Sequence, residues 1–242
     1  MRMPELTQAI VESLYDKFAP LIGLRIHWLS LPEPALPGFE PSQIAVIINT
    51  LLDAALPQIE LLATNPDNLA KLTHLGLQKA PQEIGNRESY PDYIHTSGYR
   101  VELKGLFVDN PALDLKRPPT RREPSARLKE NITLANVVPD RDVLMLAAVQ
   151  LQEFTGLCYP VIVDIGLFPM IACIRARDAR LLESGGRWKD GVPQVIKNTS
   201  QARYNAGETL TDSDYQKDTN FGKLKRIPYP PLQAFMQKHH TI

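Results

Sequence analysis

The sequence has little cysteine: Cys158 and Cys173 are the only two thiols among 242 residues. Two cysteines exclude a disulfide scaffold, and these two do not form a Cys-x-x-Cys pair. Long hydrophobic runs are also missing, since no stretch reaches about 18 uninterrupted apolar residues, and we expect no membrane span. The first residues lack the apolar run of a signal peptide. The sequence therefore predicts a cytoplasmic protein with reduced thiols.

Motifs for nucleotide binding and serine hydrolysis are absent as well. There is no Walker-type phosphate loop and no Gly-x-Gly-x-x-Gly, so we expect no nucleotide cofactor. There is no Gly-x-Ser-x-Gly elbow. None of the five histidines is spaced with a cysteine as in a zinc site.

The chain carries no net charge, with 27 basic and 27 acidic residues. This balance argues against a protein that coats nucleic acid non-specifically. The distribution is uneven, because residues 1–92 have a net charge of −5 and residues 93–242 a net charge of +5. The asymmetry indicates an acidic face and a basic face, with chance and ordinary solvated surface as an equal alternative, and it is compatible with a local basic cleft.

Hydrophobic periodicity predicts helices in the first third of the chain and strands after it. Apolar spacing indicates helices over 5–18, 42–62 (capped by Ser42 and kinked at Pro57) and 65–75. Strands are expected over 89–94, 99–108, 143–149 and 161–168, with a helix from Pro169 to about Glu183. This order predicts an α/β (α+β) fold with a mixed central β-sheet flanked by helices and a helical N-terminal part.

The segment most informative about chemistry contains Pro91-Asp92, then nine intervening residues, then Glu102-Leu103-Lys104. A turn at Ser97-Gly98 would fold the second strand back beside the first. Glu102 and Lys104 are two residues apart, so they share one face of their strand. Two carboxylates held together repel each other unless a divalent cation lies between them, and oxygen ligands suit Mg²⁺. The alternative is a solvated Glu–Lys pair on a surface hairpin.

This pattern resembles the active-site motif of the PD-(D/E)xK nuclease superfamily, which includes type II restriction endonucleases, Holliday-junction resolvases and repair nucleases. The resemblance implies that Asp92, Glu102 and the carbonyl of Leu103 hold Mg²⁺, with Mn²⁺ as a substitute, and that Lys104 is the catalytic lysine. Many members add an acid from a preceding helix, for which Glu60 is the first candidate and Glu83 the second. The resemblance also implies a restriction-endonuclease-like core.

Two clusters of basic and amide side chains are candidate DNA contacts. The first is a proline-rich loop with six basic residues and one acidic residue between Lys116 and Lys129. The second lies between Arg187 and Arg226, where 8 basic and 5 acidic residues occur. Such side chains bind phosphates and base edges, although each cluster could equally be solvated surface. The candidates are Lys116, Arg117, Arg121, Arg122, Arg127, Asn198, Gln201, Arg203, Tyr204, Lys223, Lys225 and Arg226.

Taken together, these patterns predict a single nuclease domain over residues 1–242. Its parts would be a helical N-terminal region (1–78), a catalytic core (79–184) and a polar, basic, DNA-contacting C-terminal region (185–242). We expect a Mg²⁺-dependent, sequence-specific endonuclease of double-stranded DNA that acts as a homodimer, because a two-fold protein matches a palindromic site. Two alternatives remain: a structure-specific nuclease of the resolvase or repair type, and a catalytically idle DNA-binding protein of the same fold.

Overall fold

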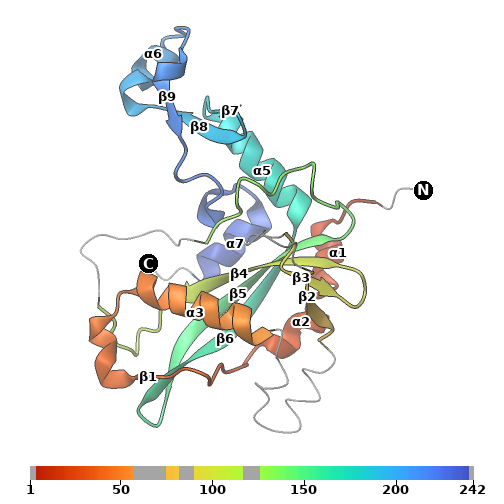
Figure 1. Cartoon of the computed structure of the whole chain (residues 1–242), viewed down its shortest axis with the longest axis vertical. Helices are drawn as coiled ribbons and strands as arrows, with labels where there is room; N and C mark the ends of the chain where they lie inside the picture. Colours follow the sequence, from red (N-terminus) through yellow and green to blue (C-terminus); the bar gives the residue numbers. More distant parts are fainter. Residues whose placement is uncertain (1–3, 57–74, 82–89, 117–125, 240–242) are drawn as a thin grey trace.

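The protein is built around a six-stranded mixed sheet that curls into a half-barrel (Figure 1). The computed structural model describes residues 4–56, 75–81, 90–116 and 126–239. The strand order is β1-β6-β5-β4-β3-β2, and only the β4–β5 pair is parallel. The predicted α/β class and mixed sheet are thus confirmed. The strands are β1 (Leu31–Pro32), β2 (Leu77–Lys79), β3 (Tyr93–His95), β4 (Arg100–Val108), β5 (Asp142–Phe154) and β6 (Leu157–Pro169).

Strand β5 is buried on both faces, as its continuous apolar run predicts. Val143, Met145 and Ala147 face one hydrophobic core, whereas Leu144 and Leu146 face a second core on the opposite side. Successive side chains alternate between these cores because the strand has a period of two. The sheet is therefore a central layer with packed side chains above and below it.

Helix α3 (Pro41–Ala55) covers the first core and packs against β4. Ile44, Ile48 and Leu52 form its buried stripe at helical spacing. The expected cap at Ser42 is wrong: the helix begins at Pro41, with Glu40 as its N-cap. Glu40 and Gln43 form a reciprocal capping box.

The N-terminal segment forms two short helices instead of the single helix expected over 5–18. Helix α1 (Gln8–Glu12) ends where the Ser13 hydroxyl donates to the Ile10 carbonyl at 2.6 Å, and α2 (Tyr15–Phe18) follows. Next come two 3₁₀ helices, η1 (Ala19–Leu21) and η2 (Glu33–Gly38). The helix expected over 65–75 lies almost wholly outside the described residues.

Helices α5 (Met170–Glu183) and α7 (Pro230–His239) cover the second core. As predicted, Pro169 precedes α5, and the helix stops before Gly185, whose φ of +75° favours glycine. Leu232 and Met236 anchor α7, which the sequence interpretation missed. Among the helices the structure describes, none is long and apolar enough to cross a membrane.

The polar C-terminal region contains a second, three-stranded antiparallel sheet that extends beyond the end of α5 (Figure 1). Trp188 and Phe221 meet edge to face at its base, with ring centroids 5.1 Å apart. Its elements are β7 (Arg187–Lys189), β8 (Val192–Ile196), η4 (Asn198–Ser200), α6 (Gln201–Asn205), η5 (Asp212–Asp214) and β9 (Tyr215–Lys217), followed by η6 (Leu224–Arg226).

A charged cluster fastens the end of α7 to strand β6. The buried Asp164 carboxylate accepts from Lys238 Nζ and His239 Nε2, each at 2.7 Å. Burial alone would raise the pKa of Asp164, but these two donors and the Ile165 amide outweigh it and hold the pKa below its usual value. The unfolded chain therefore takes up the proton first, so this stabilisation is present above about pH 4 and is lost as pH falls further.

We expect Asp164→Asn to lower the free energy of unfolding by about 1–3 kcal/mol at pH 7, because Lys238 and His239 lose a charged acceptor that is itself buried. The difference from wild type should shrink as pH falls below about 4. Urea denaturation between pH 7 and pH 3 measures it, with the exposed Asp114→Asn as the control. A difference independent of pH would contradict this account of the cluster.

Candidate active site

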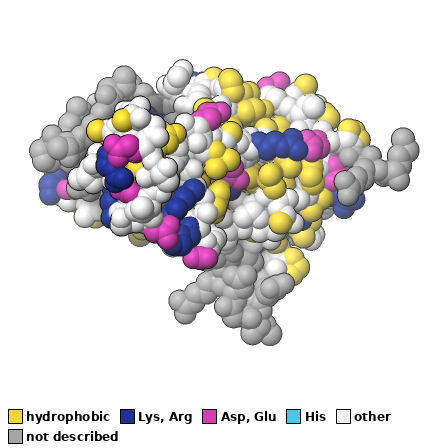
Figure 2. Space-filling model, turned by 90° about the horizontal axis from the view of Figure 1, so that it is seen from above, with side chains coloured by type: hydrophobic (Ala, Val, Ile, Leu, Met, Phe, Trp, Pro, Cys, Tyr) yellow, Lys and Arg dark blue, Asp and Glu magenta, His cyan; other side chains and the backbone are white. Residues whose placement is uncertain are grey.

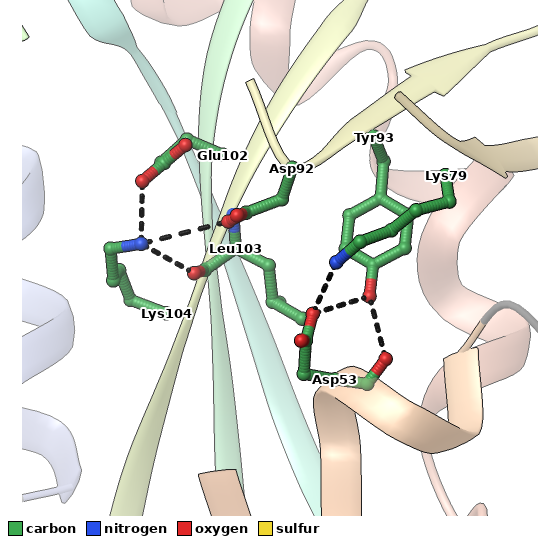
Figure 3. Close-up of polar contacts among 7 residues, drawn as sticks. All are labelled: Asp53, Lys79, Asp92, Tyr93, Glu102, Leu103 and Lys104. Carbon is green, nitrogen blue, oxygen red and sulfur yellow. Dashed lines mark hydrogen bonds and ion pairs between the residues drawn. The ribbon is translucent and has the colours of Figure 1, made fainter. Parts of the chain in front are cut away.

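The predicted hairpin exists, and it brings the four motif residues together (Figure 3). Strands β3 and β4 pair through Tyr93 and Val101, and the chain turns through Gly98, whose φ is +89°. One expectation is wrong: the strand predicted over 89–94 is only Tyr93–His95, so Asp92 lies just before it. Because Asp92 is outside the strand, its side chain turns towards β4 and accepts from the Leu103 amide at 2.8 Å.

Lys104 lies between the two carboxylates. Its ammonium group is 2.5 Å from Glu102 Oε1 and 3.6 Å from Asp92 Oδ2. It also donates to the Leu103 carbonyl at 3.0 Å. Three oxygen atoms from Asp92, Glu102 and the Leu103 backbone thus surround one cation, as Figure 3 shows. The Leu103 side chain belongs to the first hydrophobic core, on the opposite face of β4.

Glu102 is the most buried member of this group, only 4% exposed. Burial raises the pKa of Glu102; the positive charge of Lys104 opposes this shift, and the negative charge of Asp92 adds to it. Burial lowers the pKa of Lys104, but attraction to Glu102 and Asp92 outweighs burial and raises it overall. The lysine is therefore held in its charged form.

One oxygen of this site has no hydrogen-bond donor. Glu102 Oε2 is fully buried, and within the described part of the chain nothing donates to it. A buried carboxylate oxygen without a donor is costly, and a bound cation would remove that cost. The oxygen-only donor set suits Mg²⁺, which commonly uses one or two carboxylates and keeps several waters. Thus Asp92, Glu102 and the Leu103 carbonyl fit the metal that the sequence implies.

The additional acid expected from a helix cannot be placed. Glu60 and Glu83 both lie outside the described residues. Within the described ranges, no group of three or more His, Cys, Asp or Glu side chains gathers at one point. The site there consists of two carboxylates and one backbone carbonyl.

A second polar cluster lies beside Asp92, and the sequence interpretation missed it. Asp53, near the end of α3, pairs with Lys79 on β2 at 2.6 Å. Tyr93 donates to Asp53 Oδ1 at 3.1 Å, as Figure 3 shows. No local pattern links these three residues, because they meet only when α3 packs over the sheet. The cluster fixes α3 to the strand that follows Asp92.

The two basic segments that carry candidate DNA contacts are neighbours in the structure. The backbone of Arg127 bridges to that of Lys223, so the ends of the two basic segments are neighbours. The positive charge of the neighbouring Lys129 also acts on Glu102 and lowers its pKa. The two segments are joined by backbone hydrogen bonds, Leu128 N to Gly222 O at 2.8 Å and Leu224 N to Ala126 O at 3.0 Å. The two basic segments thus meet through their backbones, and Lys129 in the first of them lies near enough to act on Glu102.

The other candidates are distributed differently. Lys116 is exposed and lies 3.8 Å from Glu40. Lys225 is exposed and Arg226 half-buried, both on η6. Arg117, Arg121 and Arg122 lie outside the described residues.

Asn198, Gln201, Arg203 and Tyr204 are exposed on the second sheet unit, which Figure 1 places away from β3 and β4. Arg203 there pairs with Glu208 and Asp214, each at 2.8 Å. On the face in Figure 2, basic and acidic side chains are interspersed. The structure does not bring these four residues to the motif.

Comparisons with known proteins add nothing to this geometry. No family model matches the chain, and no curated protein and no solved structure matches it either.

Proposed function

We propose that the protein is a Mg²⁺-dependent endonuclease of double-stranded DNA with its active site at Asp92, Glu102 and Lys104. The observation that carries the proposal is the buried Glu102 carboxylate, whose Oε2 has no donor among the described residues while Oε1 shares the Lys104 ammonium with Asp92. This arrangement leaves one buried oxygen ready to coordinate a cation. It also departs from the alternative of a solvated surface pair, because Glu102 is buried.

Each residue has a distinct role in this proposal. Asp92, Glu102 and the Leu103 carbonyl would hold Mg²⁺, which when bound activates water and offsets charge on the phosphate. Lys104 contributes a permanent positive charge at the same place, where it can orient the attacking water and stabilise the extra charge of the transition state. Leu103 contributes twice, since its amide also orients Asp92.

The surroundings support DNA as the substrate. Arg127, Lys129 and Lys223 lie on the Glu102 side of the sheet, where they can bind phosphate oxygens. The helix before the hairpin and the buried strands after it follow the element order that the PD-(D/E)xK resemblance implies. We propose a type II restriction enzyme, cytoplasmic and homodimeric, with the second sheet unit as its additional DNA-contacting part.

Digestion of plasmid DNA by the purified protein tests the proposal directly. With Mg²⁺ we expect sharp fragments on a gel, and with chelator none. Cleavage restricted to branched DNA would move the assignment to a resolvase or repair nuclease. Intact DNA of every form, with Mg²⁺ and with Mn²⁺, would overturn the proposed function.

A further inference from the structure

A polar cluster around the buried Asp142 lies next to the segments of Asp92 and Glu102 and has no role in the chemistry described so far. The Tyr90 hydroxyl donates to Asp142 Oδ2, which also accepts from the Val138 amide at 2.8 Å. The other oxygen, Asp142 Oδ1, lies 3.2 Å from Arg100 Nε as an ion pair without hydrogen-bond alignment. The guanidinium carbon of Arg100 lies 5.2 Å from the centre of the Tyr90 ring. Each of the three side chains, Tyr90, Arg100 and Asp142, therefore contacts the other two.

The cluster joins the two segments that carry the carboxylates. Tyr90 is two residues before Asp92, and Arg100 is two residues before Glu102 on the same face of β4. Asp142 opens the neighbouring strand β5 and is paired in register with Arg100. Asp142 thus contacts the segment of Asp92 and the strand of Glu102 at once.

Asp92 depends on this support because it lies outside the strand. On its C-terminal side the β3–β4 ladder begins with Tyr93, and the Asp92 carbonyl accepts from the Ala80 amide at 3.0 Å. On its N-terminal side, the nearest described side chain with a tertiary hydrogen bond is Tyr90. That hydrogen bond ties the residue before Pro91 to the first residue of β5.

We propose that Tyr90, Arg100 and Asp142 form a positioning cluster that sets the separation of the Asp92 and Glu102 carboxylates. The inference rests on the proposed function, since it treats these carboxylates as the metal ligands. Replacing a residue that orients a metal ligand without binding the metal itself commonly lowers metal affinity or activity by about 10–100-fold. Tyr90→Phe keeps the ring over Arg100 and removes only the hydroxyl.

The experiment measures Mn²⁺ binding by calorimetry in the absence of DNA. We expect Tyr90→Phe to weaken binding about tenfold. Arg100→Gln should weaken it similarly, and it serves as a second variant if Tyr90→Phe folds poorly. The matched control is Tyr229→Phe, because Tyr229 also packs on the second core and donates one hydrogen bond, to Gln8 at 3.0 Å. Control binding should equal that of wild type.

A second readout separates positioning from loss of stability. If the cluster only sets ligand separation, tenfold more Mn²⁺ should restore cleavage by Tyr90→Phe to the wild-type maximum, whereas a partly unfolded protein would stay slow. Unchanged Mn²⁺ affinity in both Tyr90→Phe and Arg100→Gln would overturn the inference, as would wild-type binding that survives in Asp92→Asn. If Mn²⁺ binds with the expected dependence on Tyr90 but no DNA is cut, the proposed function fails and the positioning cluster stands.

Discussion

Asp92→Asn is expected to reduce the rate of Mg²⁺-dependent DNA cleavage about a thousandfold, because it removes one of the two charged ligands that we propose for Mg²⁺. Asparagine retains an oxygen that can accept from the Leu103 amide, as Asp92 does at 2.8 Å. The local backbone should therefore persist, and the loss would report on charge. Single-turnover cleavage, followed on a labelled duplex, measures the effect.

The control for this variant is Asp109→Asn, at an exposed aspartate just beyond the end of β4. This substitution changes the net charge by the same amount as Asp92→Asn. The Asp109→Asn protein should cleave DNA at the wild-type rate. Circular dichroism should show both variants folded. Cleavage by Asp92→Asn at the wild-type rate, with the same dependence on Mg²⁺, would remove Asp92 from the active site.

Gly222→Ala is expected to lower the free energy of unfolding by about 3–4 kcal/mol, one of the largest single-residue effects in the chain. Gly222 has a φ of +72°, a conformation that costs other residues about 1–2 kcal/mol. An added Cβ would also lie 1.9 Å from the Leu128 carbonyl oxygen, which belongs to buried backbone. This residue joins the two basic segments beside the site, so the substitution disrupts that junction.

Gly207→Ala separates the cost of the positive φ from the cost of the steric contact with Leu128. Gly207 has a similar φ of +78°, yet a Cβ there would meet no atom within 4 Å. We expect it to lose only about 1–2 kcal/mol, the conformational cost alone. Urea denaturation of both variants measures the difference. Equal losses would show that the contact with Leu128 is relieved by a small backbone shift.

The parts of the fold that could be predicted are those specified by local pattern. Strand β5 is a continuous apolar run, and α5 has Pro169 before it and Gly185 after it, so both are readable along the chain. Strands β1 and β2 have two and three residues, too short for any periodicity to appear. Helix α7 was missed because only Leu232 and Met236 of its apolar residues are buried, within a polar segment.

In the candidate site too, the features set by local sequence pattern could be predicted and those set by tertiary packing could not. The hairpin spacing was enough to predict that Asp92, Glu102 and Lys104 meet. The extent to which Glu102 is buried depends on tertiary packing on the second-core side of β4, which no local pattern specifies. Asp142 is 52 residues from Tyr90 in sequence, and no pattern links residues that far apart. The helix-borne acid stays a prediction, because Glu60 is outside the described residues.

The position of Lys104 implies that cation binding is an exchange reaction. Two carboxylates and one ammonium group leave a single net negative charge in a largely buried space. Lys104 acts as an internal counterion for Glu102 and Asp92. A bound Mg²⁺ would compete with Lys104 for these carboxylates. Weakening that ion pair would use part of the binding free energy, and the affinity for the free ion would be lower. We therefore expect Mg²⁺ and DNA to bind cooperatively, with phosphate oxygens supplying the ligands and the new ion-pair partner that Lys104 then lacks.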